Sequence, residues 1–284
     1  MSASFDQIGP DRLKWPVILS VPHAGRVYPK ALSDDCRHAP TQLRILEDRY
    51  ADLLVRNAEA QGFSGLIARV PRAWIDLNRA EQDVDPGMLT APLGPAVHLS
   101  AKARGGLGLI PRRTAQLGEI WHRRLTPDQV RARISDDYRP YHTALAVLLK
   151  AARSEFGGAI LLDVHTMPPL PATGDGPPPQ IIIGDRFGRS AAQSIAQQAA
   201  HCARAAGYRT AFNVPYAGGH ILDRHARPDE NIHGLQIEVD RRLYLDAALI
   251  EPGPGLPAIA HLIATSAQTL SKRMLQDDQS IAAE

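Results

Sequence analysis

The most constraining feature of the sequence is an apolar run that begins at Ile160 and ends in His165, Thr166 and Pro168. A bounded apolar run of this length predicts a strand that is covered on both faces of a sheet. In open α/β sheets, ligands bind beyond the carboxyl ends of the strands. We therefore expect a buried strand that delivers His165 to a binding site.

A second apolar run, residues 17–21, ends in the turn Pro22-His23-Ala24-Gly25. One histidine beside a strand end is most often an ordinary hydrogen-bonded residue. Two histidines in matching positions make a shared metal site an equal alternative. Asp163, two residues before His165 and on the same side of the strand, is a candidate hydrogen-bond partner for it.

The rest of the chain alternates strand and helix patterns, which predicts an α/β fold. The Gly- and Pro-rich residues 80–111 indicate a long loop over a site, and their glycines do not complete a phosphate-binding motif. Further strands are expected at residues 65–70, 180–185 and 234–241, and helices at residues 41–55, 126–138, 144–156, 190–206 and 257–274.

Length and composition favour one domain over residues 1–284, with a core at about 15–275 and flexible termini. No apolar run approaches the roughly 20 residues that span a bilayer, and no secretory signal is visible, so we expect a cytoplasmic protein without a membrane partner. Two cysteines are too few for a disulfide framework, and neither lies in a Cys-x-x-Cys pair, which argues against zinc held by thiolates. A net charge of +2 argues against nucleic acid as a partner.

A catalytic zinc site needs three nitrogen or oxygen ligands and an open position. His23, His165 and either Glu47 or Asp48 could supply them, and Glu238 on a strand is a candidate general base. Spacing alone leaves ordinary alternatives open, because no compact His-Glu-x-x-His motif is present. The acidic residues near 47–52 would then form a charged helix face, and Glu238 would face solvent.

Several segments share the residue types and chain order of one known family. Together they cover roughly residues 17–246, and on them the chain resembles the N-formylglutamate amidohydrolase family. The segments are Ser20-Val21-Pro22-His23-Ala24-Gly25, Trp74-Ile75-Asp76-Leu77-Asn78-Arg79, Gly106-Leu107-Gly108-Leu109-Ile110-Pro111-Arg112, Arg139-Pro140-Tyr141-His142, Leu162-Asp163-Val164-His165-Thr166-Met167-Pro168, Asn213-x-Pro215-Tyr216-Ala217-Gly218-Gly219, and Leu235-Gln236-Ile237-Glu238-Val239-Asp240-Arg241-x-Leu243-Tyr244.

The resemblance implies a three-layer α/β/α fold with a central, mostly parallel or mixed sheet, as in zinc exopeptidases and aspartoacylase-like deacylases. It implies one Zn²⁺ per chain, with another divalent metal as an alternative, held by His23, His165 and Asp48, or Glu47 in place of Asp48. The sequence departs from the wider exopeptidase pattern at Arg26, three residues after His23, where carboxypeptidases have a glutamate ligand.

The resemblance also implies roles for other residues. Glu238 is expected to be the general base and Arg72 to polarise the scissile carbonyl. The residues expected to bind the substrate are Asn78, Arg79, Arg112, Met167 and His142.

The implied reaction is hydrolysis of the formyl amide of an N-formyl acidic amino acid, most simply N-formyl-L-glutamate, to formate and L-glutamate. Such a reaction belongs to amino-acid catabolism, for example histidine degradation. The alternatives are a metal-dependent deacylase or carboxypeptidase-like hydrolase of another N-acyl amino acid or peptide, and a non-catalytic anion-binding protein. The expected partner is a small anionic substrate derived from an amino acid.

Overall fold

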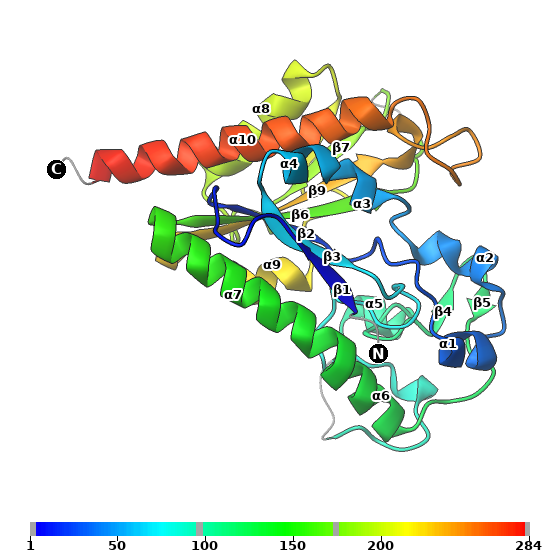
Figure 1. The fold of residues 1–284 in the computed structure, drawn as a ribbon. Coiled ribbons are helices and arrows are strands. Elements are labelled where there is room, and N and C mark those ends of the chain that lie inside the picture. The colour runs from blue at the N-terminus through cyan, green and yellow to red at the C-terminus, as the bar shows by residue number, and fades with distance from the viewer. Residues whose placement is uncertain (1–3, 95–98, 173–175, 282–284) are drawn as a thin grey trace. The chain divides into compact units, whose positions relative to one another are not determined.

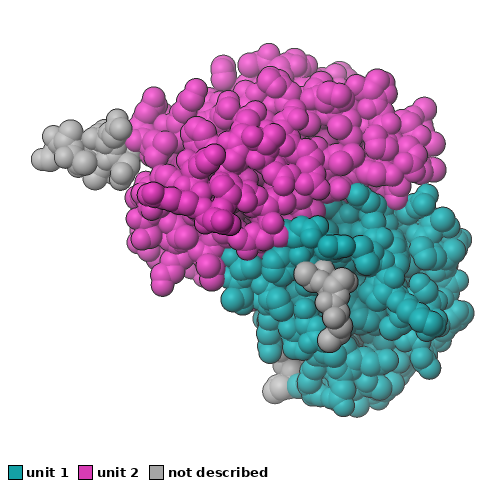
Figure 2. All heavy atoms as spheres, viewed as in Figure 1, with its two compact units in different colours: residues 1–6, 22–47, 68–144 teal, residues 7–21, 48–67, 145–284 magenta. Residues whose placement is uncertain are grey.

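The computed structural model describes residues 4–94, 99–172 and 176–281 (Figure 1). Its chain divides into two compact units, each assembled from separate segments and coloured in Figure 2. Unit 1 contains residues 1–6, 22–47 and 68–144, and unit 2 contains residues 7–21, 48–67 and 145–284. The chain therefore passes repeatedly from one unit to the other.

A seven-stranded sheet with the strand order β1-β3-β2-β6-β9-β7-β8 forms the centre of unit 2, apart from the ends of β1 and β3. Strand β7 runs antiparallel to β9, whereas the pairs β2–β3, β2–β6, β6–β9 and β7–β8 are parallel, so the sheet is mixed, as expected. The strands are β1 (Phe5–Ile8), β2 (Val17–Val21), β3 (Ser64–Ala68), β6 (Ala159–Met167), β7 (Ile181–Gly184), β8 (Thr210–Phe212) and β9 (Ile232–Asp240).

The apolar run that begins at Ile160 forms β6, in which all nine residues are buried. Strand β6 lies between β2 and β9, and helices cover both faces of the sheet, which explains why the run is largely apolar. Its register places Asp163 opposite Ser20 and His165 opposite Glu238. Since alternate residues of a strand share a face, these polar side chains lie on one face of an otherwise apolar sheet.

Helices cover both faces of this sheet and give the three layers expected from the sequence (Figure 1). On one side lie α3 (Ala51–Leu54), α4 (Arg56–Ala60), α8 (Gln193–Ala205) and α10 (Leu256–Ile281); on the other lie α9 (His220–His225) and the later part of α7 (Arg139–Phe156). The buried residues Ile259, Ile263, Ala267, Leu270 and Met274 recur at helical spacing along α10. Among the described residues, no helix is both long and apolar enough to cross a membrane.

Unit 1 is built from short elements joined by loops. At the start of α6, Thr126 Oγ1 accepts a hydrogen bond from Gln129 N, and Gln129 Oε1 accepts one from Thr126 N. This capping box confirms the helix start expected there. The elements are α1 (Lys30–Asp35), α2 (Pro40–Leu43), η1 (Arg44–Leu46), η2 (Pro86–Met88), α5 (Ala101–Arg104), β4 (Arg113–Thr114), β5 (Gly118–Glu119), α6 (Pro127–Arg133) and the π-helical turn η3 (Ile134–Tyr138).

The expectation of one continuous helix over residues 41–55 is wrong. Glu47 has an extended backbone and Tyr50 a left-handed one, with a φ of 57°. Between them, Arg49 donates from Nε to the carbonyl of Ile250. Contacts with residues far along the chain therefore override local helical spacing here. At the C-terminus α10 continues beyond the expected end at residue 274 to Ile281, and residues 282–284 lie outside the described part of the chain.

Candidate functional site

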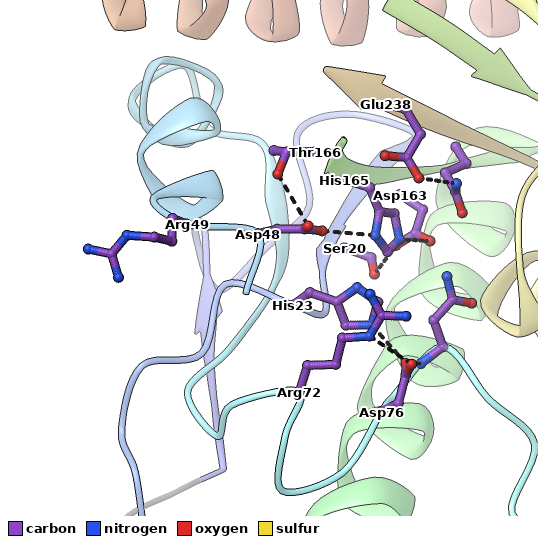
Figure 3. Close-up of polar contacts among 12 residues, drawn as sticks. Ser20, His23, Asp48, Arg49, Arg72, Asp76, Asp163, His165, Thr166 and Glu238 are labelled. Carbon is purple, nitrogen blue, oxygen red and sulfur yellow. Dashed lines mark hydrogen bonds and ion pairs between the residues drawn. The ribbon is translucent and has the colours of Figure 1, made fainter. Parts of the chain in front are cut away.

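In unit 2, His165 lies between two carboxylates (Figure 3). Its Nε2 donates to Asp163 Oδ2 at 2.8 Å, and its Nδ1 donates to Asp48 Oδ2 at 3.1 Å. Ser20 Oγ in turn donates to Asp163 Oδ1 at 2.7 Å. All four side chains are buried, so three separate segments of the chain hold the ring of His165 in one orientation.

The protonation of His165 is governed by these neighbours. Burial acts to lower the pKa of its imidazole, but the carboxylates of Asp163 and Asp48 outweigh burial and hold the pKa well above its ordinary value. Both ring nitrogens face carboxylate oxygens. An ionised carboxylate accepts hydrogen bonds and cannot donate them, so both ring nitrogens act as donors. A divalent cation placed between Nδ1 and Asp48 would meet the same attraction to negative charge.

The other carboxylate oxygen of Asp48 is also engaged. Thr166 Oγ1 donates to Asp48 Oδ1 at 3.2 Å, and Arg241 donates to the same oxygen from Nη2 at 3.3 Å. Arg241 reaches Thr166 Oγ1 as well, from Nε at 3.2 Å. Asp48 is thus fixed on both oxygens by residues of β6 and of the segment after β9.

Glu238 and Gln236 lie on β9, opposite His165 and Asp163 in the strand register. Both side chains are buried, and Gln236 Nε2 donates to Glu238 Oε1 at 2.8 Å. An unpartnered buried carboxylate would be costly, and the amide of Gln236 offsets that cost on one oxygen. Glu238 therefore lies beside His165, on the neighbouring strand of the sheet.

In unit 1, the buried carboxylate of Asp76 gathers several functional groups (Figure 3). His23 Nε2 donates to Asp76 Oδ1 at 2.8 Å, and the backbone N–H of Asn78 donates to the same oxygen at 2.8 Å. Arg72 Nε donates to Oδ2 at 2.8 Å, and Arg79 Nη2 lies 3.8 Å from that oxygen. One carboxylate thus orients a histidine and two arginines.

The pKa of Asp76 reflects that position. Complete burial acts to raise it, but Arg72, Arg79 and His23 outweigh burial and hold the pKa well below its ordinary value. Asp76 therefore stays ionised and accepts the Nε2 proton of His23. Nδ1 is then the ring nitrogen with which His23 would bind a metal.

Gly25, in the turn that carries His23, passes very close to another backbone segment. A Cβ atom at residue 25 would lie 1.9 Å from the carbonyl oxygen of Val70. No side chain fits at that distance, which explains the glycine of the Pro-His-Ala-Gly turn.

The segment from Asp76 to Arg79 is held by its surroundings in unit 1. Tyr138 Oη donates to the carbonyl of Arg79 at 2.8 Å, and His142 Nε2 donates to the carbonyl of Leu77 at 3.0 Å. Arg79 is buried and donates from Nε to the carbonyl of Leu107 at 2.9 Å. His142 is itself buried, and its Nε2 hydrogen bond goes to the segment that carries Asn78 and Arg79.

Three further residues expected at the site have different surroundings. Arg112 pairs with Asp85 and Glu119, at 2.7 Å in each case. Met167 is the buried last residue of β6. Glu47, the alternative acidic ligand, is buried in unit 1 and accepts a hydrogen bond from Tyr28 Oη.

Sequence reasoning missed the partners that orient these groups, namely Ser20, Asp76, Thr166, Gln236 and Arg241. All of them lie inside segments that were already singled out by their residue types. A usable signal was a polar residue two positions from a candidate ligand or base on a strand, as with Gln236 and Glu238. No comparable local signal pairs Asp76 with His23, because they lie 53 residues apart.

Comparisons with known proteins show the family of this chain. The family model described as N-formylglutamate amidohydrolase matches residues 15–245. An N-formylglutamate deformylase of Pseudomonas aeruginosa is 30% identical over 249 residues, which cover 81% of this chain and 82% of that protein. An N-formylglutamate deformylase of Pseudomonas putida is 30% identical over 238 residues, with the same coverage of 81% and 82%.

Solved structures show the same fold. The crystal structure of an N-formylglutamate amidohydrolase from Ralstonia eutropha has a TM-score of 0.89 and 30% identity, covering 97% of this chain and 99% of that chain. The structure of a gene product of Agrobacterium tumefaciens has a TM-score of 0.69 at 19% identity, covering 98% and 97%. The second likeness concerns the fold alone.

Proposed function

Because this chain belongs to the N-formylglutamate amidohydrolase family, we propose that it hydrolyses the formyl amide of an N-formyl acidic amino acid. N-formyl-L-glutamate is the first candidate substrate, with formate and L-glutamate as products. The observation that carries the proposal is that His23 and His165 each donate Nε2–H to a buried aspartate. Carboxylate partners of this kind orient histidines that bind zinc through their other ring nitrogen.

The residues present fit a metal ion. His23, Asp48 and His165 are buried, and each offers one ligand atom. The chain path supports bringing His23 to the others, because only Pro22 separates it from Val21, the last residue of β2, and β2 pairs with β6. We assign these three residues to one Zn²⁺ or another divalent cation. Asp48 is preferred to Glu47 because it already contacts His165.

When bound, the metal would supply Lewis-acid chemistry, polarising the formyl carbonyl and acidifying a water molecule. Glu238 would accept the proton of the attacking water and pass it to the leaving amine. Gln236, which donates to Glu238 Oε1, would help to hold this carboxylate in place. Arg72, fixed by Asp76, would donate hydrogen bonds to the oxyanion that develops on the formyl group.

An acidic amino acid brings two carboxylates, which require cationic or amide partners. Asn78 and Arg79 are the first candidates, since the whole segment around them is braced by Tyr138 and His142. Arg112 could bind a carboxylate in exchange for Asp85 or Glu119. Met167 and His142 are both buried, and their roles in substrate binding stay predictions.

We further propose that the two units act together as one amidohydrolase domain spanning residues 1–284. Neither unit is a continuous stretch of sequence, so neither corresponds to a segment that could be cut out as a whole. A cytoplasmic location and a role in histidine degradation stay predictions from the sequence.

Formate release tests this proposal. Purified protein would be assayed on N-formyl-L-glutamate, N-formyl-L-glutamine, N-acetyl-L-aspartate and a dipeptide, with release of the free amine measured alongside formate. We expect kcat/KM for N-formyl-L-glutamate to exceed that for the glutamine analogue by at least about 100-fold, because the analogue leaves a cationic group unpaired.

Preferred turnover of the acetyl compound or the dipeptide would instead indicate the related deacylase or carboxypeptidase-like activity. Binding of these anions without turnover of any of them, by protein loaded with metal, would indicate the non-catalytic binding protein.

A further inference from the structure

The segment that follows β9 contains an arginine to which the reaction assigns no role. Arg241 begins the short helical turn η5 (Arg241–Leu243) and belongs to the family-like segment that ends at Tyr244. Its side chain is 14% exposed, much less than the 50% of its neighbour Arg242. Arg242 pairs with Asp240, whereas Arg241 turns toward Asp48.

The two carboxylate oxygens of Asp48 have different partners. Oδ1 accepts from Arg241 Nη2 at 3.3 Å and from Thr166 Oγ1 at 3.2 Å. Oδ2 faces Nδ1 of His165 at 3.1 Å. Arg241 also donates from Nε to Thr166 Oγ1. Its planar guanidinium therefore binds both the carboxylate of Asp48 and the hydroxyl group that donates to that carboxylate.

We propose that Arg241 is a positioning residue that makes Asp48 a one-oxygen metal ligand through Oδ2. The inference rests on the proposed metal site. A carboxylate can bind a metal through one oxygen or both, and a zinc site that must keep an open position is served by one-oxygen binding. Arg241 and Thr166 occupy Oδ1 and turn Oδ2 toward His165.

The backbone around Asp48 is held by the same end of β9. Tyr244 Oη donates to the carbonyl of Arg49 at 2.6 Å, and Arg49 Nε donates to the carbonyl of Ile250 at 2.7 Å. This region has no regular helix to hold it, because the chain is non-helical from Glu47 to Tyr50. The turn after β9 thus fixes both the backbone and the carboxylate of the acidic ligand.

Two effects of Arg241 on metal affinity have opposite signs, which makes the inference testable. As a positive charge near a cation it weakens metal binding, whereas by orienting Asp48 it strengthens binding. Replacement by glutamine removes both effects. Replacement by lysine keeps the charge and removes the planar fork, so the lysine variant isolates positioning.

The experiment measures Zn²⁺ affinity by competition with a chromophoric chelator for the wild type, Arg241→Gln, Arg241→Lys and the matched control Arg242→Gln. We expect Arg241→Lys to bind Zn²⁺ about 10- to 100-fold more weakly, Arg241→Gln to show a smaller loss because it also removes the positive charge, and the control to match the wild type. Thr166→Val, which removes the other donor to Oδ1, should give a smaller loss in the same direction. Thermal unfolding of the metal-free proteins verifies that each variant is folded.

The visible spectrum of Co²⁺-loaded protein supplies a second readout of coordination. Release of Oδ1 should raise the coordination number and reduce the intensity of the d–d bands in both Arg241 variants. Unchanged or tighter Zn²⁺ binding with an unchanged Co²⁺ spectrum would overturn the role of Arg241. A wild-type protein that binds no metal would instead overturn the proposed metal site.

Discussion

His23 and His165 have the same kind of neighbour although they come from different parts of the sequence. Each donates Nε2–H to an aspartate that is buried, Asp76 for His23 and Asp163 for His165. Asp76 also accepts a hydrogen bond from Asn78 N, and Asp163 also accepts one from Ser20 Oγ. At this scale the protein fixes the orientation of each ring before any ligand arrives.

The proposed role of Glu238 as general base leads to a prediction for Glu238→Gln. The amide is nearly isosteric but accepts no proton, so kcat should fall about 100- to 10,000-fold while the bound metal stays at the wild-type level. Formate release and elemental analysis measure the two quantities. Glu230→Gln, at an exposed ion pair with Arg153, is the matched control and should keep wild-type turnover. A Glu238→Gln variant that kept most of its turnover would show that another group is the base.

His225 gives a prediction for stability at acidic pH. Burial, with the charges of Arg224, His220 and Arg227, lowers the pKa of its imidazole to about 3. In the unfolded chain that pKa is about 6.5, so between these values only the unfolded state takes up the proton. This group therefore makes the folded state less stable as the pH falls below about 6.5, by roughly 2 kcal/mol at pH 5.

Urea unfolding at pH 7 and pH 5 measures this effect. In His225→Gln the decrease in unfolding free energy between the two pH values should be smaller than in the wild type by roughly 2 kcal/mol. His201→Gln, at an exposed position on α8, is the control and should behave like the wild type. Equal decreases in His225→Gln and the wild type would contradict the buried neutral imidazole.

At the scale of elements, the sequence predicted what local patterns determine. The runs that became β2 and β6 are apolar on both faces because each has a neighbour on either side and helices above and below. The broken helix near residue 48 could not be predicted, since its cause is Arg49 reaching Ile250, 201 residues away. The short strands β1 and β8 also escaped prediction, having four and three residues.

The turn after β2 leads to a prediction for Gly25→Ala. Its new Cβ would lie 1.9 Å from the Val70 oxygen, so the turn with His23 must shift. We expect a loss of at least about 1–3 kcal/mol in unfolding free energy and weaker Zn²⁺ binding. Urea unfolding and chelator competition measure both. Gly94→Ala, where a Cβ would have no heavy atom within 4 Å, should change neither quantity; a Gly25→Ala protein indistinguishable from it would refute the close approach.

At the scale of the whole molecule, the sequence supports the fold class, the order of the functional segments and the family. It could not supply the hydrogen-bond pairing of residues across long separations, such as Asp76 with His23, which are 53 residues apart. Nor could it reveal the division into two units, because both units are assembled from several segments. Such pairings depend on the three-dimensional path of the chain, which a local pattern does not record.

We propose above that His23, Asp48 and His165 hold one metal ion on which hydrolysis depends. The most direct test strips the protein with a chelator, titrates it with Zn²⁺ and follows formate release from N-formyl-L-glutamate. Activity should be absent in the stripped protein, rise linearly and level off at one equivalent of Zn²⁺ per chain. Full activity in stripped protein whose metal content is verified as zero would contradict the account.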